Sequence, residues 1–400
     1  MRLRTFESFW LVKNGILYSY PSLQEDLKTE ILVIGGGITG ALTSHALMES
    51  GYQVTLIDRR DIAMGSSSAT TSMLQYEIDV PLYELSEMIG EESAATCYRA
   101  GVQAIFNLKQ LVDSLQLDCG FEMKESLYLA HSKKASTWLR KEFKLREKHE
   151  LGVKWLSASE VTARYGMISH GAILSEVAAS VDAYKLAHEL IQYNVKRGMT
   201  VYDQTEIDQI VTTTPQPSVL LSTGNTIQAE KIICCTGFES TKMLKEKVAD
   251  LFYTYATVSE QGILVNEQVK RTIFWNTANP YLYMRTTDDG RFLIGGEDSA
   301  FNIPLFQQRI KERKSDILIK KLEKILPEIE FIEDFSWAGT FGTTKDGLPY
   351  IGASPEFDNM LFVLGFGGNG ITFSVQGMEL VVNMLQGKPH PLAKFYRFGR

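Results

Sequence analysis

Three glycines are placed where an apolar strand is expected to pass into a helix. Gly35, Gly37 and Gly40 form a G-x-G-x-x-G pattern directly after the apolar run 31–34. In such a pattern the first glycine permits a tight turn, the second lets the backbone approach a pyrophosphate, and the third allows a helix to pack closely on a strand. Amide groups at the start of that helix favour the negative charge of phosphates. The spacing therefore predicts a dinucleotide site.

The elements around these glycines support the prediction. Apolar residues recur at helical spacing from Ile38, Gly51 is expected to end that helix, and the segment 53–58 is predicted to be a second strand. Asp58 ends this strand, where its carboxylate can accept bonds from both ribose hydroxyls and would repel a 2′-phosphate. Strand, glycine turn, helix and strand make a βαβ unit, which favours dinucleotide binding over a chance glycine turn and argues against NADP.

Composition limits the other classes of function. The chain has 400 residues, which suggests two or three domains, with 44% hydrophobic and 22% charged residues and a net charge of -7. Its basic patch, 133–148, is predicted to be a solvated helix face, so nucleic acid is not an expected partner. The stretches 31–48 and 359–378 lack charged residues, but clustered glycines interrupt both, so no membrane span is expected. The segment 1–27 is predicted to be an ordered arm.

The four cysteines show neither metal-ligand spacing nor a secreted disulfide pattern, which favours a reducing, cytoplasmic setting and predicts no metal site. Further along the chain, a hairpin is predicted to turn at Gly224 and Asn225, and a buried strand follows at 231–235. Near the C-terminus a second glycine turn precedes an amphipathic helix that ends before Gly387.

Four motifs give the chain its resemblance to a known family. They are "VIGGGITG" with "VTLIDRR", the serine-rich "GSSSATTSML", "SVDAYKLAHEL", and "WAGTFGTTKDGLPYIG" followed by "GFGGNGI". From about residue 27 to residue 392 the chain resembles the superfamily of FAD-dependent amine oxidoreductases that includes D-amino acid oxidase, glycine oxidase and sarcosine oxidase. The resemblance implies an α/β fold: a Rossmann-like FAD-binding domain (28–77, 169–241 and 334–392) with an interleaved α+β substrate domain (78–168 and 242–333) built on a mostly antiparallel sheet.

The resemblance also implies a set of cofactor-binding residues. Asp58 would bind the adenosine ribose, Arg59 would lie near the adenine, and Ile207 would cover it. Ser66 and Ser67 would lie at the pyrophosphate or ribityl chain, and Ser72 and Met73 along the isoalloxazine ring. The full set of expected residues is Gly35, Gly37, Ile38, Thr39, Gly40, Asp58, Arg59, Ser66, Ser67, Ser72, Met73, Ile207, Thr236, Gly237, Gly367, Gly368, Asn369, Gly370 and Ile371. The last five would direct backbone amides at the flavin N1 and C2 carbonyl, and helix N-termini are suited to such negative charge.

The expected substrate residues are less specific. Tyr281, Tyr283 and Arg285 share one strand face by the two-residue period, and an arginine between aromatic rings can hold a carboxylate. The alternative is a sheet face whose arginine reaches solvent. Where glycine oxidase-like members carry substrate-binding arginines, this chain has Phe341 and Gly368, so an unmodified D-amino acid or glycine is not the expected substrate unless Arg285 replaces them.

These departures extend to the cofactor. The residues 340–343 include no cysteine that could attach FAD as in sarcosine oxidases, so we expect non-covalent FAD. Leu293 stands near the position where sarcosine oxidases have a lysine that activates oxygen, which leaves oxidase and dehydrogenase open.

The function that these residues favour is oxidation of a C–N bond in a small amino acid derivative or secondary amine. Hydride would pass to flavin N5 and the imine would be hydrolysed, while the protein orients the substrate and stabilises charge. One alternative is a dehydrogenase that passes electrons to a quinone or carrier protein. Another is a flavin-bound redox sensor without amine turnover. An NAD-dependent dehydrogenase would need a catalytic acid near a nicotinamide, and no candidate is found. A homo-oligomer is compatible with the sequence.

Overall fold

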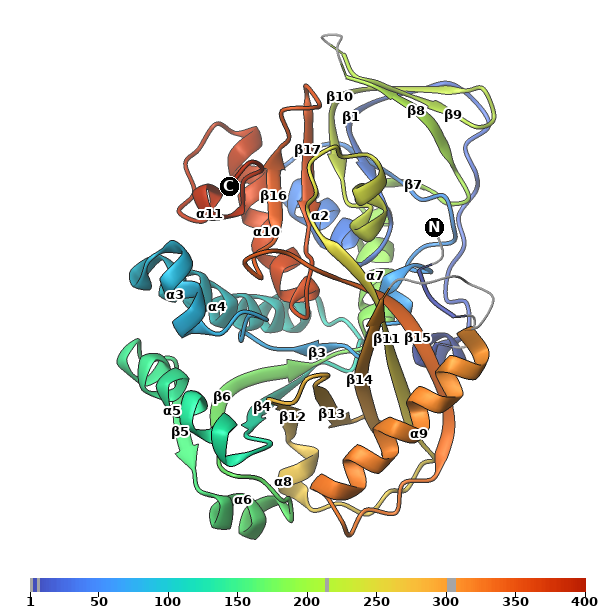
Figure 1. The fold of residues 1–400 in the computed structure, drawn as a ribbon. Coiled ribbons are helices and arrows are strands. Elements are labelled where there is room, and N and C mark those ends of the chain that lie inside the picture. Colours follow the sequence, from blue (N-terminus) through green and yellow to red (C-terminus); the bar gives the residue numbers. More distant parts are fainter. Residues whose placement is uncertain (1–2, 6–7, 213–215, 301–306) are drawn as a thin grey trace.

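The computed structural model describes residues 3–5, 8–212, 216–300 and 307–400, and it contains two sheets with helices packed around them (Figure 1). Within the described residues, one sheet has eight strands and is largely parallel at its centre, and the other has nine and is mostly antiparallel. The α/β class and the two-sheet arrangement that the sequence predicts are confirmed.

The first sheet is organised around the predicted βαβ unit. β1 (Leu27–Ile34) pairs in parallel with β2 (Val54–Ile57) on one side and with β10 (Thr226–Cys234) on the other. The last four residues of β1 are buried, as expected for a strand covered on both faces. The remaining strands are β7 (Thr200–Tyr202) beside β2, β17 (Met360–Leu364) beside β10, β16 (Tyr350–Ala353), and the hairpin of β8 (Ile207–Val211) and β9 (Ser218–Leu221).

Three helices pack together beside this sheet. α2 (Ile38–Glu49) connects β1 to β2, and it contacts both α7 (Ala183–Val195) and α10 (Gly370–Leu385). Gly51 has a φ of 89°, so a glycine suits the turn that leaves α2, as predicted. α7 begins at the cap Asp182, whose side chain accepts from the Lys185 amide.

The second sheet is covered on its outside by helices. Its spatial order is β15 (Glu333–Thr343), β11 (Asp250–Ser259), β14 (Phe292–Ala300), β13 (Leu282–Thr286), β12 (Thr272–Asn276), β4 (Glu122–Leu129), β6 (Ala172–Ser180) and β3 (Met73–Leu74), with β5 (Val153–Leu156) beside β6. Its neighbouring helices are α3 (Leu82–Ile89), α4 (Glu91–Leu115), α5 (Lys133–Lys148), α6 (Ala158–Tyr165), α8 (Glu267–Lys270) and α9 (Gln307–Ile325). α9 lies across β11, β14 and β15 (Figure 1).

The sheets divide the chain differently from the sequence-based boundaries. β6 and β15 fall within the segments expected to belong to the cofactor domain, yet both pair within the second sheet. Both sheets contain strands with runs of buried apolar residues, so the sequence pattern does not reveal which sheet a strand joins. The helix predicted at 133–148 is present as α5, but it is not wholly solvated, because Glu142 and Arg146 are fully buried.

The N-terminal arm is ordered where it is described. Its short helix α1 (Phe9–Asn14) buries Phe9 and Trp10. The Phe9 ring stacks on Phe335 and Trp337, so the arm is anchored to β15. The remaining described helical turns are η1 (Ser66–Ser68), η2 (Gly237–Lys242) and, near the C-terminus, α11 (Ala393–Tyr396).

Candidate active site

A cavity of about 910 Å³ lies between the two sheets. Its wall begins at the carboxyl ends of β1 and β2, where open α/β sheets bind their ligands. It continues over the segment 65–79 and the start of α10 to the strands of the second sheet. Both halves of the protein therefore contribute to one space of a size that suits a cofactor together with a small ligand.

The glycine turn forms one end of the cavity. Gly35 has a φ of 105°, and a Cβ there would lie 2.6 Å from the Cys235 carbonyl oxygen. A Cβ on Gly40 would lie 1.8 Å from the Gly35 carbonyl oxygen, so α2 approaches the turn more closely than any other residue would allow. Gly37 lines the cavity, and the nearest atom to its Cβ position is Ser67 Oγ, at 3.0 Å. The tight turn at Gly35 and the close packing at Gly40 are thus as their spacing predicts, and Gly37 is open to the cavity.

Asp58 lies in the wall at the end of β2. Its carboxylate accepts hydrogen bonds from the amides of Gly36 and Arg60, both at 2.8 Å. Burial raises the pKa of Asp58, and the two amide bonds oppose that rise. Arg59 also lines the cavity, and its guanidinium pairs with Glu239, which Arg60 contacts as well. Ile207, Thr236 and Gly237 line the same region.

The serine-rich segment lies against the glycine turn rather than in solvent. Ser67 Oγ accepts from the Ile38 amide at 2.9 Å, so it caps the first turn of α2. Ser66 and Met73 line the cavity. Ser72 does not: it is fully buried, and its hydroxyl faces the Ala183 amide at the start of α7. Ser72 therefore does not line the cavity in which the isoalloxazine ring is expected.

Three consecutive carbonyls of this segment each receive a side-chain donor. Trp337 Nε1 donates to the Ala69 oxygen at 2.8 Å, and Trp10 Nε1 donates to the Thr70 oxygen at 2.7 Å. Arg285 Nε donates to the Thr71 oxygen at 2.8 Å. The donors come from β15, the arm and β13. Since Ala69, Thr70 and Thr71 line the cavity, these donors hold its wall in place, Trp10 and Arg285 from outside the lining and Trp337 from within it.

Arg285 consequently differs from its predicted role. Tyr281 and Tyr283 line the cavity, but Arg285 does not. Its guanidinium also donates to the Thr286 oxygen and lies 5.6 Å from the centre of the Trp10 ring. Burial lowers its pKa to about 10. Thr71 lies between this arginine and the cavity. Arg285 therefore does not line the cavity with the two tyrosines, although the sequence places all three on one strand face.

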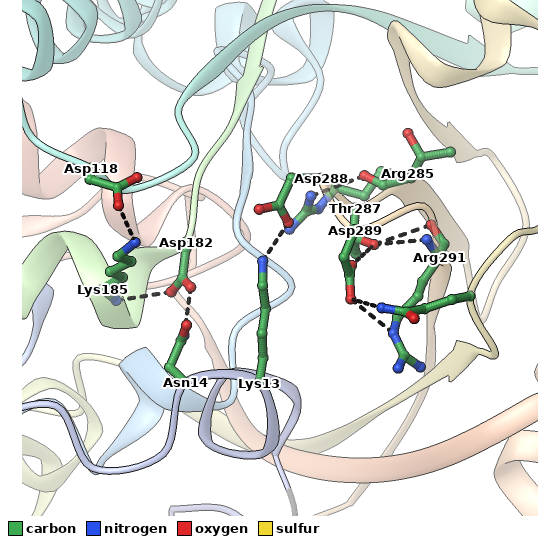
Figure 2. Close-up of polar contacts among 12 residues, drawn as sticks. Lys13, Asn14, Asp118, Asp182, Lys185, Arg285, Thr287, Asp288, Asp289 and Arg291 are labelled. Atoms are coloured by element: carbon green, nitrogen blue, oxygen red, sulfur yellow. Dashed lines mark hydrogen bonds and ion pairs between the residues drawn. The ribbon is translucent and has the colours of Figure 1, made fainter.

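Contacts of the arm hold this region together (Figure 2). Lys13 Nζ lies 2.5 Å from Asp288 in the loop between β13 and β14, and Asn14 Nδ2 donates to Asp182, the cap of α7, at 2.7 Å. The arm thus joins the hairpin that carries Arg285 to the helix that follows β6.

The start of α10 lines the cavity with all five predicted residues, Gly367 to Ile371. No side chain caps this helix within the described residues, so its first amides form a site of positive potential. The Gly368 amide donates to Asp79 Oδ2 at 2.9 Å. A Cβ on Gly367 would lie 2.4 Å from the same oxygen, so Asp79 fills the space beside this turn.

The extended segment after η1 supplies residues that our sequence-based prediction missed. Gln75, Glu77 and Asp79 line the cavity, as the predicted Met73 does, whereas the intervening Leu74, Tyr76 and Ile78 are buried in the core. This strict alternation is visible in "MLQYEID". It could have indicated an extended segment with one polar face, because period-two alternation is the mark of such a segment.

The second sheet completes the wall with aromatic and acidic side chains. The rings of Tyr128 and Trp275 stack at 3.5 Å, and those of Tyr281 and Tyr283 lie 5.6 Å apart. The lining residues from this sheet also include Thr254, Asn276, Asp298 and Phe341. Burial raises the pKa of Asp298, and burial together with the charge of Asp298 raises the pKa of Asp79 to about 6.

Comparisons with known proteins agree with this geometry. A family model described as FAD dependent oxidoreductase (DAO) matches residues 30–382. The chain belongs to this family. The cofactor is therefore FAD, and the protein is an oxidoreductase.

Several relatives cover most of the chain. A Bacillus subtilis (strain 168) protein with the provisional description Rieske 2Fe-2S iron-sulfur protein YhfW is 24% identical, over 98% of this chain and 75% of its own length. Glycine oxidase of Geobacillus kaustophilus (strain HTA426) is 25% identical, over 90% of this chain and 93% of its own. Gamma-glutamylputrescine oxidoreductase of Escherichia coli (strain K12) is 22% identical, over 95% and 89% respectively.

A solved structure shares the fold. The crystal structure of glycine oxidase from Geobacillus kaustophilus superposes with a TM-score of 0.78 at 20% sequence identity, covering 94% of this chain and 99% of that one.

The residues present fit FAD. Gly35 and Gly37 leave backbone open where a pyrophosphate needs close approach, and Asp58 stands at the end of β2 for the ribose. At the other end, the uncapped start of α10 offers amides to an electron-rich ring edge. That FAD is held without a covalent bond remains a prediction.

The search for membrane-spanning helices and metal sites covers only the described residues. Among them, no helix is long and apolar enough to cross a membrane. No group of three or more histidine, cysteine or acidic residues with metal-binding geometry occurs within the same residues. All four cysteines are buried thiols.

Proposed function

We propose that the protein oxidises a C–N bond of an amine or amino acid derivative held in the cavity against the second sheet. Two relatives, named glycine oxidase and gamma-glutamylputrescine oxidoreductase, support this choice of bond. FAD supplies the two-electron acceptor for the hydride that leaves the substrate carbon, while the nitrogen releases a proton and water converts the imine to a carbonyl compound and a free amine.

The observation that carries the proposal is the continuity of the cavity. One space joins the glycine turn, the N-terminus of α10 and the aromatic wall of β12 and β13. A cofactor anchored at the glycine turn can therefore extend toward a substrate at Tyr281 and Tyr283. Such a wall orients the reacting carbon and keeps water away, and both effects lower the barrier without a protein acid or base.

The chain's own residues have three roles in this proposal. Asp58 and the Gly37 backbone bind the adenosine and pyrophosphate parts, and the first amides of α10 stabilise negative charge on the ring. Tyr281 and Tyr283 position the substrate, with the Tyr283 hydroxyl 3.3 Å from Thr254 Oγ1.

An anaerobic titration of the purified, FAD-loaded protein tests the proposal. Loss of the visible flavin absorption on addition of an amine or amino acid, with formation of a carbonyl product, is the expected result. If no compound in a panel of primary amines, secondary amines and amino acids reduces the flavin, the proposed reaction is wrong and a flavin-bound redox sensor becomes the better explanation.

The electron acceptor is a separate question. After anaerobic reduction by substrate, admission of air distinguishes an oxidase from a dehydrogenase. Rapid return of the flavin spectrum with formation of hydrogen peroxide would identify an oxidase. A slow return in air that a soluble quinone accelerates would identify a dehydrogenase that serves a quinone or a carrier protein.

A further inference from the structure

The substrate part of the cavity carries carboxylates, but no basic side chain among the described residues lines it there. Among the described lining residues, the basic side chains are Arg59, Arg60 and Lys242, and all three lie on the first sheet's side. The second sheet contributes Asp298, and the segment after β3 contributes Glu77 and Asp79. A carboxylate substrate would meet repulsion at this end of the site.

Glu77 is a buried carboxylate with an unused oxygen. It is 4% exposed, and its Oε1 accepts from Ser175 Oγ at 2.7 Å. Its Oε2 is buried and has no hydrogen-bond partner among the described residues. A buried, unpaired acceptor of this kind is costly unless a ligand supplies a donor.

The cation nearest Glu77 is shared with a second carboxylate. Arg146 Nη1 lies 3.6 Å from Glu77 Oε1, beyond hydrogen-bond distance. The Nε of the same arginine donates to Glu142 Oε1 at 2.6 Å, and both of these side chains are fully buried. Two carboxylates thus share one guanidinium, which leaves one negative charge in excess next to the cavity.

Asp298 provides a second unused acceptor. Its Oδ1 is buried and has no hydrogen-bond partner in the described part of the chain, although the Thr254 hydroxyl lies beside this carboxylate. The lysines nearby, Lys314 and Lys321, are bonded to the neighbouring Glu297. Asp298 therefore presents negative charge toward Asp79 and Tyr281, whose pKa values it helps to raise.

The aromatic part of the wall has the same preference as the carboxylates. Tyr128, Trp275, Tyr281 and Tyr283 surround this end of the cavity. The faces of aromatic rings attract ammonium groups, and the attraction strengthens where water is excluded. Unpaired acceptors beside such rings make a site for organic cations.

We propose that the substrate is a diamine or polyamine with no carboxylate next to the reacting carbon. This inference rests on the proposed function. One amine nitrogen and its carbon undergo the two-electron oxidation described above, with water entering and an aldehyde and ammonia leaving. The second ammonium is unchanged, and it lies against the carboxylates of Glu77 and Asp298 and the surrounding rings.

The test uses three compounds that differ at one end. 1,4-Diaminobutane has the second ammonium, 1-aminobutane lacks it, and 4-aminobutanoate replaces it with a carboxylate. Each is titrated into the FAD-loaded protein, with binding followed by calorimetry and reduction followed anaerobically by flavin absorbance. We expect the Kd of 1,4-diaminobutane to be lower than that of 1-aminobutane by a factor of about ten or more. We expect 4-aminobutanoate to bind most weakly.

Variants assign the effect to the named carboxylates. Asp298→Asn and Glu77→Gln keep the shape but remove the charge, so the advantage of the diamine over 1-aminobutane should fall in each. Asp118→Asn is the matched control, because this exposed residue pairs with Lys185 outside the cavity lining. It should leave the advantage unchanged.

The outcomes separate the two proposals. If 4-aminobutanoate or glycine binds and reduces the flavin better than the diamine, the cation site is wrong while C–N oxidation stands. If no compound reduces the flavin but the diamine still binds tightly and Asp298→Asn weakens that binding, the cation site stands and the oxidation is wrong. Equal binding of all three compounds would overturn the cation site whatever the flavin does.

Discussion

Arg285 Nε donates to the carbonyl oxygen of Thr71 at 2.8 Å, from the side of the segment that faces away from the cavity. The arginine therefore shapes the wall without entering the pocket. In the sequence, Arg285 is the best candidate for binding a substrate carboxylate. In the structure it instead supports the segment 69–71, which lines the cavity.

Replacement of this arginine should weaken cofactor binding. Arg285→Met leaves the Thr71 carbonyl without this donor, and an unsatisfied buried group costs about 1–3 kcal/mol. We expect the Kd for FAD to rise by about ten-fold or more, as measured by fluorescence titration of the apoprotein.

Arg291→Met is the control for this experiment. Arg291 lies just before β14 and pairs with Asp289 (Figure 2). It also pairs with Asp334, and it does not line the cavity. It should keep FAD affinity. Equal FAD affinities of the wild type and Arg285→Met would show that the carbonyl contacts do not hold the wall.

A side chain at Gly37 should displace the cofactor without unfolding the protein. Gly37→Val places its methyl groups in the cavity where the pyrophosphate is expected, whereas the only close contact of its Cβ is Ser67 Oγ at 3.0 Å. We expect a folded protein that purifies without flavin colour.

The comparison variant for Gly37 is Gly224→Ala, in the exposed turn between β9 and β10. Its φ of 90° makes alanine strained, but no atom lies within 4 Å of the Cβ position. This change should lower the Tm and leave FAD bound. A fully coloured Gly37→Val protein would contradict the assignment of the glycine turn.

The βαβ unit was predictable because it depends on local requirements. The turn at Gly35 and the contact of Gly40 with the Gly35 oxygen admit only glycine, so the glycines themselves indicate the backbone conformation. The site beyond it was less predictable. Arg285 and Ser72 had suitable types, but their distance from the pocket depends on how segment 69–73 crosses the second sheet. That crossing is a long-range contact, which no local pattern encodes.

The acidic residues that line the cavity, Glu77, Asp79 and Asp298, were not predicted for a different reason. The alternation of Gln75, Glu77 and Asp79 with buried Leu74 and Tyr76 is present in the sequence, but "GSSSATT" before it has no period, so nothing local marks where the extended segment begins. Asp298 gave no signal, because a single aspartate near the end of a strand is more often solvated.

The carboxyl of Asp79 should make stability depend on pH. Its pKa is raised from 3.8 to about 6, chiefly by the protein that encloses the cavity wall and then by Asp298, although solvent reaches it through the cavity. Between these two values the unfolded chain releases a proton that the native protein keeps. The contribution of Asp79 to stability is thus more favourable below the window and falls as the pH rises through it.

Asp79→Asn removes this titration. We expect the Tm of the wild-type apoprotein, relative to that of the variant, to fall as the pH rises from about 4 to about 6, because in this range the native wild type holds up to about one proton more than its unfolded chain. Parallel Tm profiles for the two proteins would show that Asp79 titrates equally in the folded and unfolded chains.

Arg146 should contribute strongly to the free energy of unfolding, because it is fully buried between two carboxylates. Arg146→Met leaves Glu142 and Glu77 buried without their shared guanidinium, and removal of one partner of a buried pair costs about 3–5 kcal/mol. Arg140→Met, on the same helix, is a suitable control because this exposed side chain lies over the Trp155 ring, 4.1 Å from its centre.

Urea unfolding of the two proteins would measure the difference. The cost of Arg140→Met should be about 1 kcal/mol or less. Adding Glu142→Gln to Arg146→Met should recover part of the loss, because one uncompensated charge is removed. Equal losses for Arg146→Met and Arg140→Met would mean that the buried pair contributes no more than a surface contact.

The donor that Trp10 supplies to Thr70 also bears on how FAD leaves the protein. The wall of the cavity is held by the arm, which is itself tied to Asp288 and Asp182. Detachment of the arm would remove this support, so the rate of cofactor release is expected to rise with the population of that locally unfolded state. The exchange half-life of FAD becomes a measure of how firmly the first residues of the chain are docked.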